Sequence, residues 1–218
     1  MRNGGRGMGS DLRRYTDVLS LIDILTHRRI TLTSPVQWVD QNDSHGLEVY
    51  RRRKSADYVT AFCMTEADET YHHWHIFAGH GHGVCVVFRK RKFIQHIAAV
   101  NGLVHGPVIY RNLSSINREK AVPTDELPFL KRKMFEDERE YRIVGLEEQL
   151  FGSMSRRIPI TLDLIERVVF SPYAPRPLLD TLKERLVSDK EVETITFRHS
   201  TLTNNREWRK AIDFLPHD

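Results

Sequence analysis

The sequence has few cysteines and no long apolar run, and each absence excludes a class of protein. Its two cysteines, Cys63 and Cys85, each lie inside an apolar segment of the 218-residue chain. This placement indicates reduced core thiols rather than a disulfide framework or a thiolate metal site. No segment approaches the roughly 18 consecutive apolar residues that a membrane-spanning helix needs. We therefore expect no membrane partner.

The first residues, MRNGGRGMGSD, also lack the apolar stretch of a signal peptide, so we expect a cytoplasmic protein. The chain is long enough for one compact domain, and its apolar fraction of 40% is ordinary for a soluble protein. No internal repeat or low-complexity segment divides it. We predict a flexible leader over residues 1–10 and a single catalytic domain over 11–218.

Basic residues are clustered, although the formal net charge is only +4. The clusters lie at residues 13–14, 28–29, 51–54, 89–92 and 131–133. Acidic residues gather at 66–69 and 136–140, which predicts a polarised surface. A phosphate-bearing partner fits this pattern. The alternative is that each cluster is a solvated strand end or helix face.

Strand patterns dominate the middle of the chain, and helical patterns flank it. The predicted strands cover 29–34, 57–65, 82–88, 106–110, 138–145, 156–162, 165–172 and 192–198. The predicted helices cover 18–25, with Thr16 or Asp17 as a cap, and 178–188. Turn-forming residues predict a loop at 35–46, and the polar stretch 112–137 predicts helix and loop. We expect an α+β fold with a mixed, mostly antiparallel central sheet flanked by helices.

The segment HHWHIFAGHGHGVCVVF, residues 72–88, contains five histidines. His73 and His75 are two residues apart, as are His80 and His82, but neither HExxH nor CxxC accompanies them, so we predict no metal site. Glycines alternate with the last two histidines, which favours a flexible turn where the backbone approaches something closely. A substrate or phosphate contact and a structural loop both remain open.

A second candidate is MFEDEREYRIVG, residues 134–145. Glu138 and Glu140 should project from the same side of the chain where a loop becomes a strand. Repulsion between them would raise the pKa of one and separate a proton acceptor from an electrostatic stabiliser. Arg142 lies on that side too and could keep one carboxylate ionised. The alternative is a solvated strand edge.

Six segments between residues 13 and 145 share their order with a known pattern. They are RRYTD, ITLTSPVQWVDQND, TAFCMTE, HHWHIFAGHGHGVCVVF, GPVIYRN and KRKMFEDEREYRIVG. This order resembles an uncharacterised bacterial family, domain of unknown function twenty-nine seventy-one. The chain departs from the family pattern at Ser44 in place of Pro, at Phe77 in place of Tyr, and at Met64 or Thr65 in place of Ser. A family without an assigned activity implies no reaction.

An early Arg, a hydroxyl residue on a middle strand and an ExE before a later strand also resemble the pattern of ADP-ribosyltransferases. The resemblance implies an ADP-ribosyltransferase-like fold with NAD as a substrate. It implies that Arg14, with Tyr15 beside it, binds a phosphate or ribose of NAD. Thr65, or less well Ser34, would shape the nicotinamide pocket.

In the same resemblance Glu140 binds the ribose, where a carboxylate stabilises positive charge as it forms, and Glu138 activates the acceptor. Glu140→Gln should then abolish activity and leave the fold intact. We further expect HHWHIFAGHGHG to form a wall of the active site that faces the ExE strand. Trp74, His80 and His82 would contact NAD there.

These features imply an NAD-dependent ADP-ribosyltransferase that acts on a macromolecular acceptor, with nucleic acid expected from the basic clusters. A bacterial toxin or anti-phage effector with a cognate antitoxin protein is the setting that the resemblance suggests. One alternative is a nuclease that uses the histidines and Arg14. Another is a non-catalytic nucleic-acid-binding module with Trp38 and Trp74 as stacking platforms.

Overall fold

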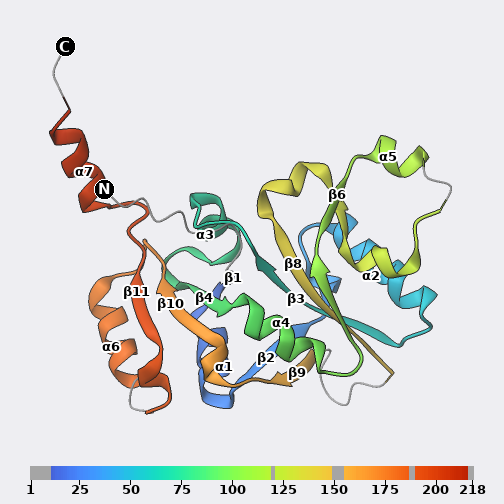
Figure 1. Ribbon diagram of the computed structural model, residues 1–218, viewed down its shortest axis with the longest axis horizontal. Coiled ribbons are helices and arrows are strands. Elements are labelled where there is room, and N and C mark those ends of the chain that lie inside the picture. The colour runs from blue at the N-terminus through green and yellow to red at the C-terminus, as the bar shows by residue number, and fades with distance from the viewer. Residues whose placement is uncertain (1–10, 119–120, 149–154, 187–189, 216–218) are drawn as a thin grey trace.

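The computed structural model describes residues 11–118, 121–148, 155–186 and 190–215 (Figure 1). The predicted leader over residues 1–10 lies outside these ranges. No helix within them is both long and apolar enough to cross a membrane.

A nine-stranded sheet organises the chain, in the order β11-β10-β4-β1-β3-β2-β9, with β8 also paired to β3 and β5 paired to β8. The strands are β1 (Asp11–Asp17), β2 (Arg29–Thr33), β3 (Tyr58–Thr65), β4 (Gly83–Arg89), β5 (Leu103–Pro107), β8 (Glu140–Glu147), β9 (Ser155–Pro159), β10 (Ile165–Phe170) and β11 (Thr196–His199). All neighbours in this sheet are antiparallel except β10 and β11. A small parallel sheet joins β6 (Ile109–Arg111) to β7 (Leu130–Arg132). The predicted α+β fold with a mixed, mostly antiparallel sheet is confirmed.

Helices lie on both sides of this sheet and at its ends. They are α1 (Val18–His27), α2 (Gln41–Arg53), α3 (Tyr71–Phe77), α4 (Lys90–Ala98), α5 (Leu113–Arg118), α6 (Arg176–Leu186) and α7 (Arg206–Asp213). Short 3-10 helices are η1 (Pro35–Gln37), η2 (His80–His82), η3 (Thr124–Phe129), η4 (Lys133–Glu138), η5 (Leu162–Leu164) and η6 (Val192–Thr194). Figure 1 shows α2 and α5 at one end of the molecule and α6 with β11 at the other.

Local patterns predicted several elements correctly. Asp17 caps α1 by accepting a hydrogen bond from the Ser20 N–H at 2.7 Å, as its short polar side chain favours. The second predicted helix, 178–188, corresponds to α6. The predicted strand 106–110 is instead two strands, because the chain leaves β5 at Val108 and β6 joins another sheet.

The predicted loop at 35–46 is wrong in its second half, where α2 begins. The Asp40 carboxylate accepts hydrogen bonds from the N–H groups of Asn42 at 3.0 Å and Asp43 at 3.5 Å, which caps the helix. Asp and Asn favour turns and helix N-termini for the same reason, because their side chains bond nearby backbone. The strand β1 and the helix α4 were not predicted.

The two faces of the sheet are covered differently. On one face α1, α4 and α6 contribute to the main core, which includes Leu21, Phe93 and Leu179. On the other face α3 packs on β1 and β4 through Trp74, while α2 packs on β3 and β8 through Leu47. The candidate site lies on this second face, where β1, β3 and β8 meet.

Candidate functional site

Two predicted site residues, Thr65 and Glu140, form a row with Arg13 across three adjacent strands. In the antiparallel register Arg13 of β1 lies opposite Thr65 of β3, and Thr65 lies opposite Glu140 of β8. Side chains directly opposite one another point to the same face. The Thr65 hydroxyl donates to the Glu138 carbonyl at 2.5 Å and accepts from the Ala67 N–H at 2.8 Å. Thr65 therefore fixes the backbone that carries the first carboxylate of the ExE.

Glu140 is bound by a fully buried arginine. Arg142 Nε and Nη2 donate to the two oxygens of Glu140 at 2.8 and 2.9 Å. Its Nη1 and Nη2 donate to the two oxygens of Asp43 in α2 at 2.9 and 2.7 Å, and Nη1 also reaches the Pro128 carbonyl at 2.9 Å. The Trp38 ring lies 5.2 Å from the guanidinium. Arg142 thus joins β8 to α2 and η3 through paired, directional bonds.

Lys131 of β7 completes the group. Its Nζ lies 2.5 Å from Glu138 Oε2, 3.0 Å from Glu140 Oε2 and 3.6 Å from Asp43 Oδ2. We call these five side chains, Asp43, Lys131, Glu138, Glu140 and Arg142, the carboxylate network. Three carboxylates share two cations there, and all five side chains are at most 12% exposed. The alternative of a solvated strand edge is wrong.

The two glutamates have opposite pKa shifts. Burial opposes ionisation of Glu140, but Arg142 and Lys131 bring its pKa down to about 2. Burial raises the pKa of Glu138 even though Lys131 is in contact with it. The pair therefore combines a permanently ionised carboxylate with one that exchanges a proton more readily. Burial raises the pKa of both carboxyls, and the bidentate bonds of Arg142 to Glu140, more than the predicted mutual repulsion, separate the two pKa values.

Acid is expected to destabilise the fold by protonating Glu140. Its pKa is about 2 in the folded protein against an ordinary value of 4.5, so the unfolded chain takes up the proton more readily. Ionised Glu140 stabilises the fold fully above pH 4.5, by on the order of 3 kcal/mol, and this contribution is lost as the pH falls towards 2.

The raised pKa values of Asp43 and Glu138 act in the opposite direction. Unfolding free energies measured from neutral pH down to about pH 2 for the wild type and Glu140→Gln isolate the contribution of Glu140. The wild type should lose stability more steeply with acid than the variant does. Identical slopes for the two proteins would contradict the assigned network.

Arg14 lies on the opposite side of β1 from Arg13. Its Nη1 donates to the Cys63 carbonyl at 2.7 Å, and its guanidinium lies 4.7 Å from the centre of the Phe62 ring. The strands β1 and β3 share one register pair, Arg13 with Thr65, and the Arg14 side chain bridges them on the Cys63 side of that pair. The structure places Arg13, rather than Arg14, in line with Thr65. Arg13 donates to the Ala67 carbonyl at 2.9 Å.

The aromatic residues singled out in the sequence pack with one another. Tyr15 is buried, stacks on His73 with 5.2 Å between ring centres, and meets the edge of Trp74 at 5.0 Å. Trp74 is fully buried, and its Nε1 donates to Glu69 at 2.7 Å. Tyr15 and Trp74 are therefore part of the core under α3, and direct contact with NAD would require this core to open.

The flexible turn predicted at residues 78–84 contains the 3-10 turn η2, and the residues before it form the helix α3, which was not predicted. Thr70 caps it by accepting from the His73 N–H at 3.2 Å. After η2, a Cβ at Gly83 would lie 2.2 Å from the Ala78 carbonyl oxygen, so close backbone packing requires glycine there. His82 is exposed, whereas the side chain of His80 lies outside the described structure. Ser34 caps η1 instead of joining the row.

Two members of the carboxylate network were not identified from the sequence. Asp43 lies in the segment predicted as a loop, and Lys131 was noted only as part of a basic cluster. A polar residue in a helix that also bears apolar Leu47 and Tyr50 would have been a signal for Asp43. In the described part of the chain, no three His, Cys, Asp or Glu side chains are grouped as metal ligands.

Most of this network lies in a segment that is similar to a known family. Residues 73–143 match the model of the family described as Protein of unknown function (DUF2971). The predicted resemblance is confirmed over this segment, which runs from α3 into β8. It includes Lys131, Glu138, Glu140 and Arg142, whereas Arg13, Thr65 and Asp43 precede it. No curated protein matches the chain.

Proposed function

We propose that the protein is an NAD-dependent ADP-ribosyltransferase whose macromolecular acceptor is a nucleic acid. The observation that carries this proposal is the pair of glutamates with opposite pKa shifts, aligned with a hydroxyl residue and an arginine on neighbouring strands. The sequence resemblance to the Arg, hydroxyl and ExE pattern of ADP-ribosyltransferases supports the same reaction.

The proposed chemistry assigns a different task to each carboxylate. The bond between nicotinamide and ribose breaks with its electron pair moving to the nicotinamide nitrogen, and positive charge develops on the ribose. Ionised Glu140 stabilises that charge. A nucleophilic oxygen or nitrogen of the acceptor then bonds to the anomeric carbon, and Glu138 takes the proton that it loses.

Access to Glu140 involves Lys131 in this proposal. Glu140 is 5% exposed, and its Oε2 accepts from both Arg142 and Lys131. A ribose hydroxyl would replace Lys131, since one ammonium on a flexible stem is displaced more easily than a bidentate guanidinium. Arg142 would stay in place and keep the carboxylate ionised and oriented.

The biological setting is proposed from resemblance. The resemblance to a bacterial family suggests a cytoplasmic toxin or anti-phage effector, which a cognate antitoxin protein would neutralise. Under this proposal, expression of the wild type in cells is toxic.

The direct test incubates the purified protein with NAD, with and without single-stranded RNA or DNA. Nicotinamide release and covalent addition of ADP-ribose to the nucleic acid are expected. Cleavage of RNA or DNA without NAD would contradict the proposal and favour the histidine-based nuclease. Nucleic-acid binding without either reaction would favour the non-catalytic module.

Glu138→Gln is expected to reduce transfer to the acceptor more than hydrolysis of NAD, because Glu138 acts on the acceptor's proton. Loss of a general base typically costs on the order of a hundredfold in rate. Both products are measured in one assay by chromatography. Glu136→Gln is the matched control, since Glu136 is half exposed and pairs with Lys133 outside the network. Equal losses of transfer and hydrolysis in Glu138→Gln would exclude this role.

A further inference from the structure

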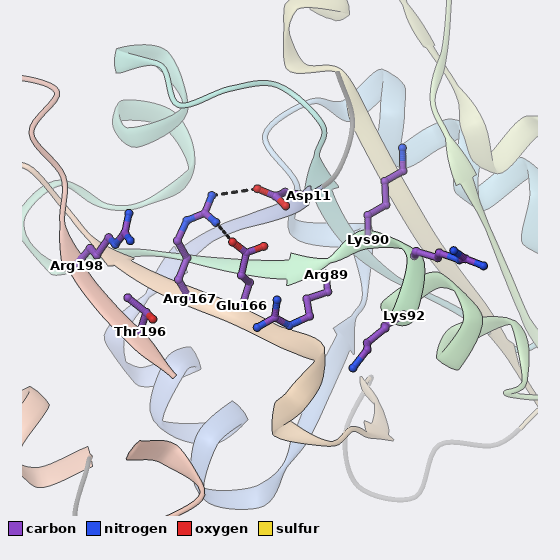
Figure 2. A pocket seen from close by; sticks show the side chains of 9 residues that line it. Asp11, Arg89, Lys90, Lys92, Glu166, Arg167, Thr196 and Arg198 are labelled. Carbon is purple, nitrogen blue, oxygen red and sulfur yellow. Dashed lines mark hydrogen bonds and ion pairs between the residues drawn. The ribbon is translucent and has the colours of Figure 1, made fainter. Parts of the chain in front are cut away.

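A basic pocket of about 550 Å³ opens beside the candidate site (Figure 2). Six of its nine lining residues are basic, and they are Arg89, Lys90, Arg91, Lys92, Arg167 and Arg198. The other three are Asp11, Glu166 and Thr196, so basic side chains exceed acidic ones by four. No apolar or aromatic side chain is among the nine. The pocket is therefore suited to an anion.

Half of the basic side chains have acidic partners. Arg167 pairs with Glu166 and with Asp11, the latter at 3.0 Å. Lys90 pairs with Glu66 at 2.9 Å and Lys92 with Asp163 at 3.3 Å. These pairs fix the walls of the pocket and neutralise part of its charge.

The other half is available to a ligand. Arg89, Arg91 and Arg198 are exposed, and they form no hydrogen bond or ion pair with any residue that the structure describes. They come from the end of β4, the first turn of α4 and β11. In Figure 2, Arg89 and Arg198 lie on either side of the Arg167–Glu166 pair. Three separated guanidinium groups suit a ligand with several phosphates rather than a single ion, because each can bind one phosphate bidentately.

We infer that this pocket binds the phosphodiester backbone of a nucleic acid without reading its bases. A guanidinium matches the geometry of a phosphate, and neutralised phosphates release counterions, which drives binding. Stacking of bases needs aromatic side chains, and none lines the pocket. The contacts therefore position a chain of phosphates and carry no base sequence.

The pocket and the carboxylate network lie on the same face of the sheet. Asp11 of β1 is opposite Arg89, and Arg13, two residues along, is opposite Thr65. Thr65 is in turn opposite Glu140. From β4 to β8 there are three strand spacings, roughly 14 Å in all. A nucleic-acid strand held in the pocket would extend to Glu138 and Glu140. That the bound nucleic acid is also the acceptor rests on the proposed function.

The experiment measures binding without NAD, by fluorescence anisotropy of labelled single-stranded RNA and DNA. The test variant is Arg89→Gln/Arg91→Gln/Arg198→Gln. Its affinity at low salt is expected to fall about tenfold or more, and its plot of log affinity against log salt should be shallower by about 2, because three phosphate contacts are lost. Oligo-U and oligo-A should bind the wild type equally.

The matched control is Arg52→Gln/Arg53→Gln/Arg157→Gln, which removes the same charge from α2 and β9. Melting temperatures verify that both variants are folded. The control should bind nearly as tightly as the wild type, and tripolyphosphate should compete only weakly. Equal losses in the two variants, a strong preference for one base, or tripolyphosphate binding as tightly as the oligonucleotide would each overturn the inference.

The two proposals fail separately. Oligonucleotide binding that depends on the pocket, together with no release of nicotinamide, would retain the pocket and exclude the transferase. Nicotinamide release together with binding that is insensitive to the pocket variant would retain the transferase and exclude the pocket.

Discussion

Arg142→Met is expected to lower the free energy of unfolding by about 3–5 kcal/mol, because it breaks a buried ion pair on one side. Arg142 is fully buried and is the bidentate partner of both Glu140 and Asp43. Methionine retains much of the aliphatic volume, so the two carboxylates remain buried and keep Lys131 as a partner but lose their bidentate one. Urea denaturation at neutral pH measures the change.

The control for this variant is Arg52→Met. Arg52 is 59% exposed and lies 3.7 Å from Glu48, so its pair is screened by water and its loss should cost at most about 1 kcal/mol. The double variant Arg142→Met/Asp43→Asn should recover part of the lost stability, since it removes one of the unpaired charges. If Arg142→Met costs as little as Arg52→Met, the network contributes little to stability.

Glu140→Gln is expected to reduce NAD hydrolysis by at least about a hundredfold, mainly in kcat. Glutamine has the same size but no charge, so the positive ribose would lose its stabilising partner in the transition state. Kinetics of nicotinamide release at saturating NAD measure the effect. In cells, a variant without activity should be tolerated where the wild type is toxic.

The burial of Glu140 changes the expectation from the sequence that Glu140→Gln leaves the fold intact. Glu140 accepts bonds from Arg142 and Lys131, so the amide should also lower stability rather than leave the fold intact. Asp43→Asn is the matched control, because it removes a charge from the same network without touching the proposed ribose. It should lose stability and keep kcat. Full activity in Glu140→Gln, or an equal loss in Asp43→Asn, would exclude the assigned role and favour the histidine-based nuclease.

The strands and the ExE pair were predictable because their signals are local. Apolar runs such as 57–65 specify strands, and residues two apart on an extended chain share a face. That rule correctly placed Glu140 and Arg142 together, whereas Glu138 is in η4 and meets Glu140 through their shared contact with Lys131. The helix cap at Asp17 was also predictable, since it involves bonds within four residues.

The nature of the site depended on contacts between distant segments. Asp43 and Arg142 are 99 residues apart in the sequence, and Lys131 comes from a second sheet. The pairing of β1 with β3 and of β3 with β8 decided that Arg13, not Arg14, lies in line with Thr65. A shift of one residue in such a register turns every side chain to the other face, and local patterns did not specify it.

The sequence by itself determined the α+β class, most strands and the pair of glutamates, because apolar periodicity and residue spacing act over a few residues. Only the tertiary structure decided that this pair is buried with two cations, and that arginines from β4, α4 and β11 surround one pocket. Ion pairing and burial depend on which segments pack together, and a pKa follows from that packing rather than from the residue's neighbours in the chain.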